Sequence, residues 1–143
     1  MSYKETILSP YSSLQLFELV MDIKAYPEFL PWVAAARIIS QEGDITYAEL
    51  VVKFKSFQEK YTSKITTTSL NKIDVEMVEG PFKYLNNHWH FEDLNDSMTN
   101  IFFEINFAFE NRLLEMLMGS MFDRASHKMM AAFTERAQKV YGC

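Results

Sequence analysis

The C-terminal part of the chain carries an apolar repeat that constrains the fold more than any other feature. Between Asn111 and Tyr141, apolar side chains recur at steps of three and four residues, and charged side chains mostly fall between them. That spacing is the period of an amphipathic α-helix. If the helix is continuous from Arg112 to Val140, it is about 43 Å long, at a rise of 1.5 Å per residue. A helix of that length with one apolar stripe needs a broad apolar surface to pack against.

The rest of the sequence supplies such a surface as strands with a period of two. In the clearest strand, from Met98 to Glu110, every second residue is large and apolar: Ile101, Phe103, Ile105, Phe107 and Phe109. Because alternate side chains of a strand point to opposite faces, these residues share one very apolar face. Similar alternation, interrupted by turn residues, predicts further strands over residues 3–8, 37–41, 46–54, 57–68, 73–77 and 84–93.

Two helices complete the predicted order of elements. The first spans residues 10–22, with Ser9 as its N-cap and Pro10 at its first position, and Asn111 is the expected N-cap of the long helix. The order is then strand, helix, about six hairpin-connected strands and a long helix. This pattern predicts one α+β domain over residues 1–143. Its antiparallel sheet of six to seven strands wraps around the C-terminal helix, with an apolar cavity between them.

Composition and charge exclude several classes of protein. Apolar residues make up 48% of the 143 residues and charged residues 23%, as in an ordinary globular domain. With 14 basic against 19 acidic residues the net charge is −5, which argues against non-specific nucleic-acid binding. The one cysteine, Cys143, provides neither an internal disulfide nor a cysteine metal cluster. We find no signal peptide and no apolar run of about 18 residues, and therefore expect a cytoplasmic protein.

Side chains with obvious chemistry are sparse. His88 and His90 would share one face of a strand, but a zinc site needs three or four converging ligands, so we predict exposed histidines and no metal. Glu104 and Asn106 lie on the second face of the phenylalanine-rich strand and are expected to face solvent. We find no glycine-rich phosphate loop and no triad motif, and we predict no catalytic residue.

The segment from Tyr26 to Trp32, with the sequence YPEFLPW, is unusually apolar and rigid. Its prolines, Pro27 and Pro31, allow at most one helical turn between them. That turn would hold three aromatic side chains and Leu30 at a fixed angle. Two interpretations stay open: a hydrophobic plug that closes one edge of the core, or part of the mouth of a ligand pocket.

Methionine is the other unusual feature of the last helix. Met118, Met121, Met129 and Met130 are predicted to face the phenylalanine-rich sheet. They form ordinary core or, because methionine side chains are long and flexible, line an adaptable apolar site. Gly119 lies among them and costs about 1 kcal/mol relative to alanine within a helix. A kink or break there would let the preceding turn move as a lid or touch a lipid surface.

Three groups of residues form a recognisable pattern. They are the YPEFLPW run, Gly80-Pro81-Phe82 with Trp89 and Phe91 downstream, and Ala132-Phe133 with Arg136-Ala137 and Tyr141-Gly142. The pattern resembles the coenzyme-Q-binding and ribosome-association-toxin family of the START-like, polyketide-cyclase-like superfamily of helix-grip folds, over essentially the whole chain. The chain departs from that family at Val33, where cysteine is usual, and at Thr134, where glutamate is usual. The first departure weakens any role for a thiol there.

The resemblance implies two competing functions. In the first, the protein binds a polyprenyl quinone such as ubiquinone, or a similar lipid, and supports respiratory electron transport without catalysis. It would then be peripheral at the inner membrane and touch it transiently through Leu113 to Phe122. In the second, it is the toxin of a toxin–antitoxin type system that binds a ribosomal subunit and blocks subunit association and translation. The net charge of −5 disfavours docking on ribosomal RNA but not on a ribosomal protein.

A cyclase or hydrolase of the wider superfamily is the weaker alternative, because the sequence shows no evident acid–base pair. If the cavity binds a hydrophobic small molecule, we expect apolar residues of the YPEFLPW segment, two strands and the last helix to line it. The predicted ligand-binding residues are Phe29, Pro31, Trp32, Trp89, Phe91, Phe103, Phe107, Met118, Met121, Phe122 and Met129. Each of them fits an ordinary core position equally well.

Overall fold

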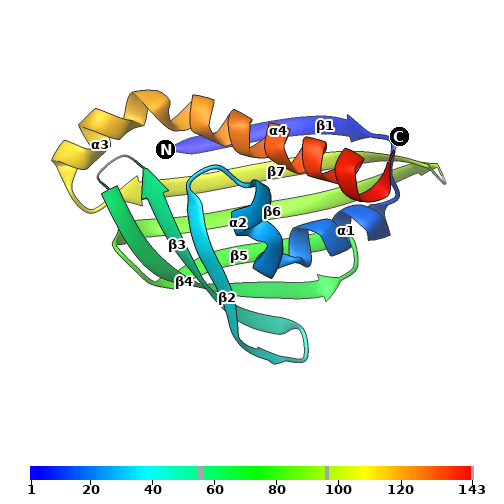
Figure 1. The fold of residues 1–143 in the computed structure, drawn as a ribbon, viewed down its shortest axis with the longest axis horizontal. Coiled ribbons are helices and arrows are strands. Elements are labelled where there is room, and N and C mark those ends of the chain that lie inside the picture. Colours follow the sequence, from blue (N-terminus) through cyan, green and yellow to red (C-terminus); the bar gives the residue numbers. More distant parts are fainter. Residues whose placement is uncertain (55–56, 96, 143) are drawn as a thin grey trace.

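The computed structural model describes residues 1–54, 57–95 and 97–142, and shows a curved sheet with helices on its concave side (Figure 1). The strands are β1 (Ser2–Ser9), β2 (Val33–Glu42), β3 (Ile45–Phe54), β4 (Phe57–Ser69), β5 (Lys72–Glu79), β6 (Phe82–Asn95) and β7 (Met98–Phe109). The helices are α1 (Ser13–Met21), α2 (Tyr26–Phe29), α3 (Arg112–Met118) and α4 (Phe122–Tyr141), with 3₁₀ turns η1 (Ile23–Ala25) and η2 (Gly119–Met121). The predicted α+β helix-grip fold is confirmed.

The sheet has seven antiparallel strands in the order β1-β7-β6-β5-β4-β3-β2. Strands β2 to β7 therefore follow one another as hairpins, while β1 crosses over to pair with β7, from Ser2 opposite Asn106 to Ser9 opposite Thr99. The alternation predicted for β7 is correct, because Ile101 and Phe103 are buried whereas Phe102 on the other face is exposed. The apolar face of β7 thus lies toward the helices.

The first helix begins later than the sequence predicted. Ser9 is not its N-cap, because it is still paired in β1 opposite Thr99. The cap is Ser12, whose hydroxyl accepts a hydrogen bond from the Gln15 backbone N–H at 3.2 Å, while the Gln15 side chain accepts one from the Ser12 N–H at 2.9 Å. This reciprocal pair is a capping box, and it fixes the start of α1 at Ser13.

The C-terminal helix is broken where Gly119 stands. Asn111 caps α3 as predicted, since its side-chain oxygen accepts from the Leu113 N–H at 2.8 Å. The helix is not continuous from Arg112 to Val140, however, because the 3₁₀ turn η2 separates α3 from α4. The break that the sequence suggested at Gly119 is therefore present, and only α4 lies along the sheet (Figure 1).

The core joins α4 to β6 and β7. The ring of Phe133 on α4 packs edge-on against Trp89 of β6, with ring centroids 5.1 Å apart, and Trp89 lies 4.6 Å from Phe103 of β7. Phe91 and Met130 are each 1% exposed in the same cluster. Toward α3 the packing opens, and the space between α4 and the sheet becomes a cavity.

Candidate functional site: a two-chamber apolar cavity

A cavity of about 400 Å³, here called the outer chamber, lies between the start of α4, the turn after α2 and strand β7. Its walls are mostly apolar, as in small-molecule sites, which commonly enclose about 300–1,000 Å³. Phe107 of β7 and Phe122 of α4 stack across it with ring centroids 4.9 Å apart. The elements that form it are the YPEFLPW segment, the end of β7 and the first turns of α4.

A second space of about 120 Å³, the inner chamber, lies deeper under α4. The two chambers adjoin, since they share wall residues from the turn after α2, four strands and α4. The shared residues are Leu30, Val33, Tyr61, Leu85, Ile105 and Met129. A long ligand can therefore occupy both.

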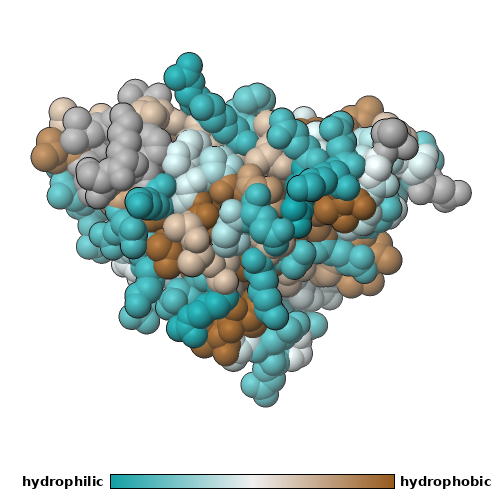
Figure 2. All heavy atoms as spheres, in the orientation of Figure 1, coloured by the Kyte–Doolittle hydropathy of each residue, from teal (hydrophilic) through white to brown (hydrophobic). Residues whose placement is uncertain are grey.

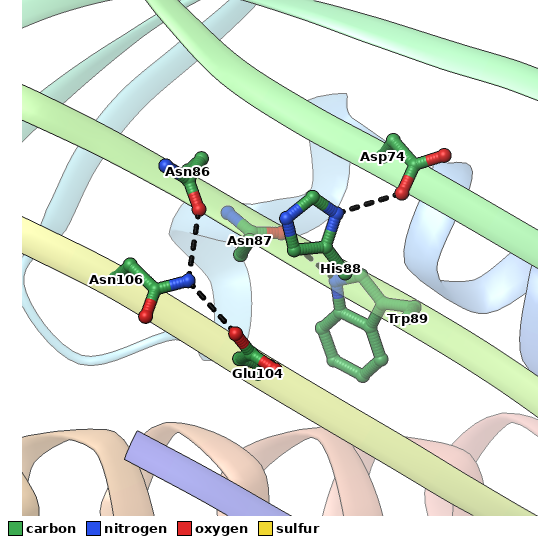
Figure 3. A network of polar contacts seen from close by, with 7 residues as sticks. All are labelled: Asp74, Asn86, Asn87, His88, Trp89, Glu104 and Asn106. Atoms are coloured by element: carbon green, nitrogen blue, oxygen red, sulfur yellow. Dashed lines mark hydrogen bonds and ion pairs between the residues drawn. The ribbon is translucent and has the colours of Figure 1, made fainter. Parts of the chain in front are cut away.

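Four side chains with a hydroxyl or amide group interrupt the apolar wall of the inner chamber: Tyr26 of α2, Tyr61 and Ser63 of β4, and Asn87 of β6. The Asn87 side-chain oxygen accepts a hydrogen bond from the indole N–H of Trp89 at 3.2 Å (Figure 3). Ser63 is 3% exposed. Among the residues described here, the inner chamber is lined by no aspartate, glutamate, histidine, lysine or arginine.

Two phenols of the inner chamber keep their protons at physiological pH. Burial raises the pKa of Tyr61 to about 12. Burial, together with the nearby Tyr61 and Asp22, raises the pKa of Tyr26 still further. The Tyr26 hydroxyl donates to the Val20 carbonyl oxygen, whereas that of Tyr61 has no hydrogen bond to another described residue. Tyr61 thus offers a neutral hydroxyl group to the cavity.

The entrance of the outer chamber, its mouth, is basic although the whole protein is acidic. Lys53, Arg124 and Lys128 line the chamber, and none forms an ion pair within the described ranges. Just before the break at Gly119, helix α3 leaves Leu113 64% exposed and Met116 79% exposed. Elsewhere hydrophilic side chains cover much of the face shown in Figure 2, with apolar surface visible between them.

Trp32, at one rim of the mouth, has an unusual backbone conformation. Its φ of 69° lies in the left-handed region, which costs a residue with a side chain roughly 1–2 kcal/mol. The Trp32 carbonyl oxygen accepts a hydrogen bond from the Lys53 N–H at 2.7 Å, which ties the turn to β3. The surrounding structure therefore imposes this conformation, and it places Trp32 at the outer chamber.

Comparison with known proteins assigns the fold to a family. The family model described as "Polyketide cyclase / dehydrase and lipid transport" matches residues 9–134. The chain belongs to this family.

Individual members of the family are named for different functions. The chain is 42% identical, over 98% of each chain, to the ribosome association toxin RatA of Rickettsia prowazekii. It is 29% identical to the coenzyme Q-binding protein COQ10 homolog B, mitochondrial, of Xenopus laevis, covering 98% of this chain and 59% of that one. A solution structure of an 18 kDa protein from Caulobacter crescentus is 37% identical, with a TM-score of 0.78 over 100% of this chain and 99% of that one.

Most residues predicted to bind a ligand line the cavity of this polyketide cyclase and lipid transport fold. Six of them line the outer chamber: Pro31, Trp32, Phe107, Met121, Phe122 and Met129. Trp89 and Phe103 line the inner chamber, which Met129 also reaches. The side chain of Met118 lies outside the described part of the chain.

Two predicted residues lie elsewhere. Phe29 packs edge-on against Phe133, with ring centroids 5.3 Å apart, and the Arg136 guanidinium lies 5.0 Å from its ring centroid. Phe91 is fully buried and belongs to the core beyond the inner chamber. Neither residue lines the outer or the inner chamber, and a contact of either with a ligand stays a prediction. An apolar residue type on an inward face does not distinguish a filled core from a cavity wall.

The sequence analysis missed the polar side chains of the inner chamber. The strand predicted over residues 57–68 has a polar outer face, where Gln58 and Lys60 are exposed. Tyr61, Ser63 and Ile65 are spaced by two, however, and so share the inward face. The signal that could have found Ser63 is its position between two apolar residues of one face.

The outer face of the sheet carries a separate polar network (Figure 3). His88 lies 2.7 Å from an Asp74 carboxylate oxygen and is exposed, as predicted. The Asn106 amide donates to both Asn86 and Glu104 at 3.0 Å. Within the described ranges no three potential metal ligands converge, and no helix is long and apolar enough to span a membrane.

Proposed function

We propose that the protein binds a polyprenyl quinone or a similar lipid in the two-chamber cavity and acts as a carrier, not as a catalyst. The observation that carries this proposal is the apolar outer chamber of about 400 Å³, which adjoins the inner chamber and opens beside an exposed apolar helix. The description of the family includes lipid transport, and one relative is named for coenzyme Q binding. Both support a hydrophobic ligand.

The residues around the cavity favour binding over chemistry. General acid–base catalysis needs a group whose pKa lies near the working pH. Among the described lining residues, the ionisable groups are three basic side chains at the mouth and tyrosines whose pKa burial raises. This set supplies hydrogen bonds and positive charge but no general base at neutral pH.

The mouth also suggests where the ligand is exchanged. Leu113 and Met116 of α3 are exposed. The basic residues Lys53, Arg124 and Lys128 line the outer chamber together with Met121 and Phe122, which follow α3 in the sequence. Apolar side chains that insert between lipids, flanked by basic ones, are typical of surfaces that bind anionic membranes. The segment from Leu113 to Phe122 would then contact the bilayer while the ligand passes.

A ribosomal role is the second candidate. The observation that favours it is the relative of 42% identity over nearly the full length of both chains, which is named for ribosome association. The same basic mouth suits a phosphate-rich surface, although the net charge of −5 opposes a general affinity for RNA. A carrier and a ribosome-binding protein differ in what they retain on purification.

The deciding experiment is native mass spectrometry with organic extraction of the protein purified from a quinone-producing host. We expect near-stoichiometric quinone in the wild type and in Leu70→Trp, which adds the same ring at an exposed turn. Leu85→Trp, which fills the junction of the chambers, should lose it. A ligand-free wild type that takes up no added quinone would contradict the carrier function, and inhibition of ribosomal subunit joining in sucrose gradients would then support the second candidate.

A further inference from the structure

The inner chamber contains hydrogen-bonding groups that the fold itself does not use. The side chain of Ser63 is buried, lines the chamber and has no hydrogen bond to any other described residue. None of the described side-chain oxygen or nitrogen atoms is both fully buried and without a hydrogen-bond partner, so the Ser63 hydroxyl must be accessible from the chamber. It is therefore available to a ligand.

Asn87 offers a second free group, and its orientation is determined. An indole N–H can only donate, so the Asn87 atom that faces Trp89 must be the amide oxygen. The amide NH₂ is then left as a donor, with no hydrogen bond to another described residue. Tyr61, at the junction of the chambers, adds a hydroxyl in the same state. The polar groups of the chamber are therefore mainly donors to an acceptor oxygen.

Register places these donors two strands apart on the sheet wall of the chamber. Ser63 pairs with Met77 and Asn87 pairs with Val75, so β5 lies between them. Neighbouring strands are about 4.8 Å apart, which puts the backbones of Ser63 and Asn87 about 10 Å or more from each other. The two side chains can therefore reach two different atoms of a ligand that lies across β5. A ring with an oxygen at each end fits this arrangement.

The charge of the cavity sets the direction of entry. The described lining of the inner chamber has no charged side chain, and burying an unpaired charge there would be very unfavourable. The basic residues Lys53, Arg124 and Lys128 all lie at the outer chamber. An anionic lipid would place its head at the mouth, whereas a neutral head is free to go inward. A cavity of about 150 Å³ already admits a benzene ring, so the inner chamber is of the right order for one.

We propose that the ligand binds head-first. A neutral ring with acceptor oxygens on opposite sides lies in the inner chamber between Ser63 and Asn87, with Tyr61 at the junction, and the apolar tail runs through the outer chamber to the mouth. This orientation rests on the proposed carrier function and adds to it the class of head group and the residues that recognise it. Para-quinone rings belong to this class, and fatty acids and phospholipids do not.

The two tryptophans of the chain report the orientation directly, because Trp89 lines the inner chamber and Trp32 the outer one. The probe is decylubiquinone, whose ring quenches tryptophan fluorescence on close approach. If the ligand binds head-first, its ring should quench most of the fluorescence of the Trp32→Phe variant, in which Trp89 is the emitter. The fluorescence of the Trp89→Phe variant, in which Trp32 is the emitter, should be quenched much less. Stronger quenching of Trp32 would overturn the orientation and leave the carrier function intact. No saturable quenching in either variant or in the wild type would contradict both.

Affinity tests the recognising residues. Loss of one neutral hydrogen bond should raise the Kd of decylubiquinone about three- to tenfold in Ser63→Ala. The matched control is Ser9→Ala, a buried serine of β1 that lines neither chamber, and its Kd should not change. Because removing an unpaired hydroxyl does not weaken packing, the melting temperature of ligand-free Ser63→Ala should not fall. An unchanged Kd in Ser63→Ala, with quinone still bound, would show that the head does not contact Ser63 and would overturn the proposal.

Discussion

Trp32 combines two roles at one position, a strained turn and a cavity wall. Its φ of 69° and its carbonyl bond to the Lys53 N–H belong to the backbone, whereas its ring lines the outer chamber. The sequence left open whether the YPEFLPW segment is a plug or a pocket mouth. Its residues Leu30, Pro31 and Trp32 line the cavity, while Phe29 packs in the core. The segment therefore does both.

We predict that Trp32→Ala weakens quinone binding more than it lowers the melting temperature. The ring contributes wall area to the ligand, whereas the backbone bond of the turn survives the substitution. Fluorescence titration, with Trp89 as the reporter, and thermal unfolding measure the two effects. Trp32→Gly is the control for strain, because glycine adopts a positive φ freely and should restore some stability without restoring affinity. A large loss of stability with unchanged affinity would instead support the plug.

Single residues of the site were only partly predictable from the sequence. Alternation assigned Phe103 and Phe107 to the inward face, because side-chain direction in a strand follows from spacing alone. It could not assign depth along that face, so Phe91 and Phe103 looked equivalent although only Phe103 lines a chamber. The same limit hid Ser63, because spacing along the strand does not show that an inward-facing side chain borders a cavity.

At the scale of elements, the break between α3 and α4 occurs at Gly119, although the backbone conformation there does not require a glycine. A Cβ atom at Gly119 would meet only the Met1 sulfur at 3.5 Å, an ordinary contact, and its φ is not positive. We therefore predict that Gly119→Ala stabilises the protein by about 0.4–1 kcal/mol, by restricting the unfolded chain. Urea unfolding gives this difference, and slower amide exchange over residues 112–121 should accompany it.

Gly80 provides the opposite case and the control. A Cβ atom there would lie 2.6 Å from the Tyr61 Cβ and 2.7 Å from the Met77 sulfur, so the turn between β5 and β6 could not pack on β4 unchanged. Gly80→Ala should destabilise by about 1–3 kcal/mol, as overpacking does. Equal effects of the two substitutions would contradict this account of the break.

Helix boundaries were predicted less accurately than the helices themselves, because local sequence patterns do not include tertiary contacts. The period of 3.6 residues correctly predicted a C-terminal helix on the apolar face of the sheet, but it runs unchanged through Gly119, so only the glycine itself indicated the break. At the other end, Ser9-Pro10 and Ser12 are both acceptable helix starts by residue type. Pairing of Ser9 with Thr99 decides between them, and that contact spans 90 residues of sequence.

At the scale of the whole molecule, charge is unevenly placed. The chain carries −5, yet Lys53, Arg124 and Lys128 surround the mouth without ion pairs in the described residues. Each basic residue near an anionic bilayer contributes roughly 1 kcal/mol. Replacing all three by glutamate should reduce binding to phosphatidylglycerol vesicles about a hundredfold or more, measured by co-sedimentation at low salt.

The control is a second triple variant with the same net charge. It replaces the exposed residues Lys24, Lys72 and Lys139, none of which lines the outer chamber, by glutamate. This control should bind vesicles much more strongly than the variant of the mouth. Equal losses in both triple variants would show that only net charge matters and would remove the mouth as the docking face. Binding to ribosomal subunits that fails only in the mouth variant would assign the basic residues to the second function.

Fold class was predictable at this scale because it depends on the order of elements and on one apolar face. The cavity was expected from the fold, but its division into two chambers was not. That division depends on how Met129, Leu85 and Tyr61 fill the space between α4 and the sheet, which is a matter of side-chain packing between distant segments.

The crossover of β1 also has a consequence for the order in which the protein forms. Among the described strands, β1 lies at the edge of the sheet and pairs with β7 alone, so it has no partner until residues 99–106 have been synthesised. Contacts so distant in sequence slow folding. Helix α4, which covers both chambers, follows β7 in the sequence and is synthesised still later. The cavity therefore forms only after α4 has been made, and a ligand can be bound only from then on.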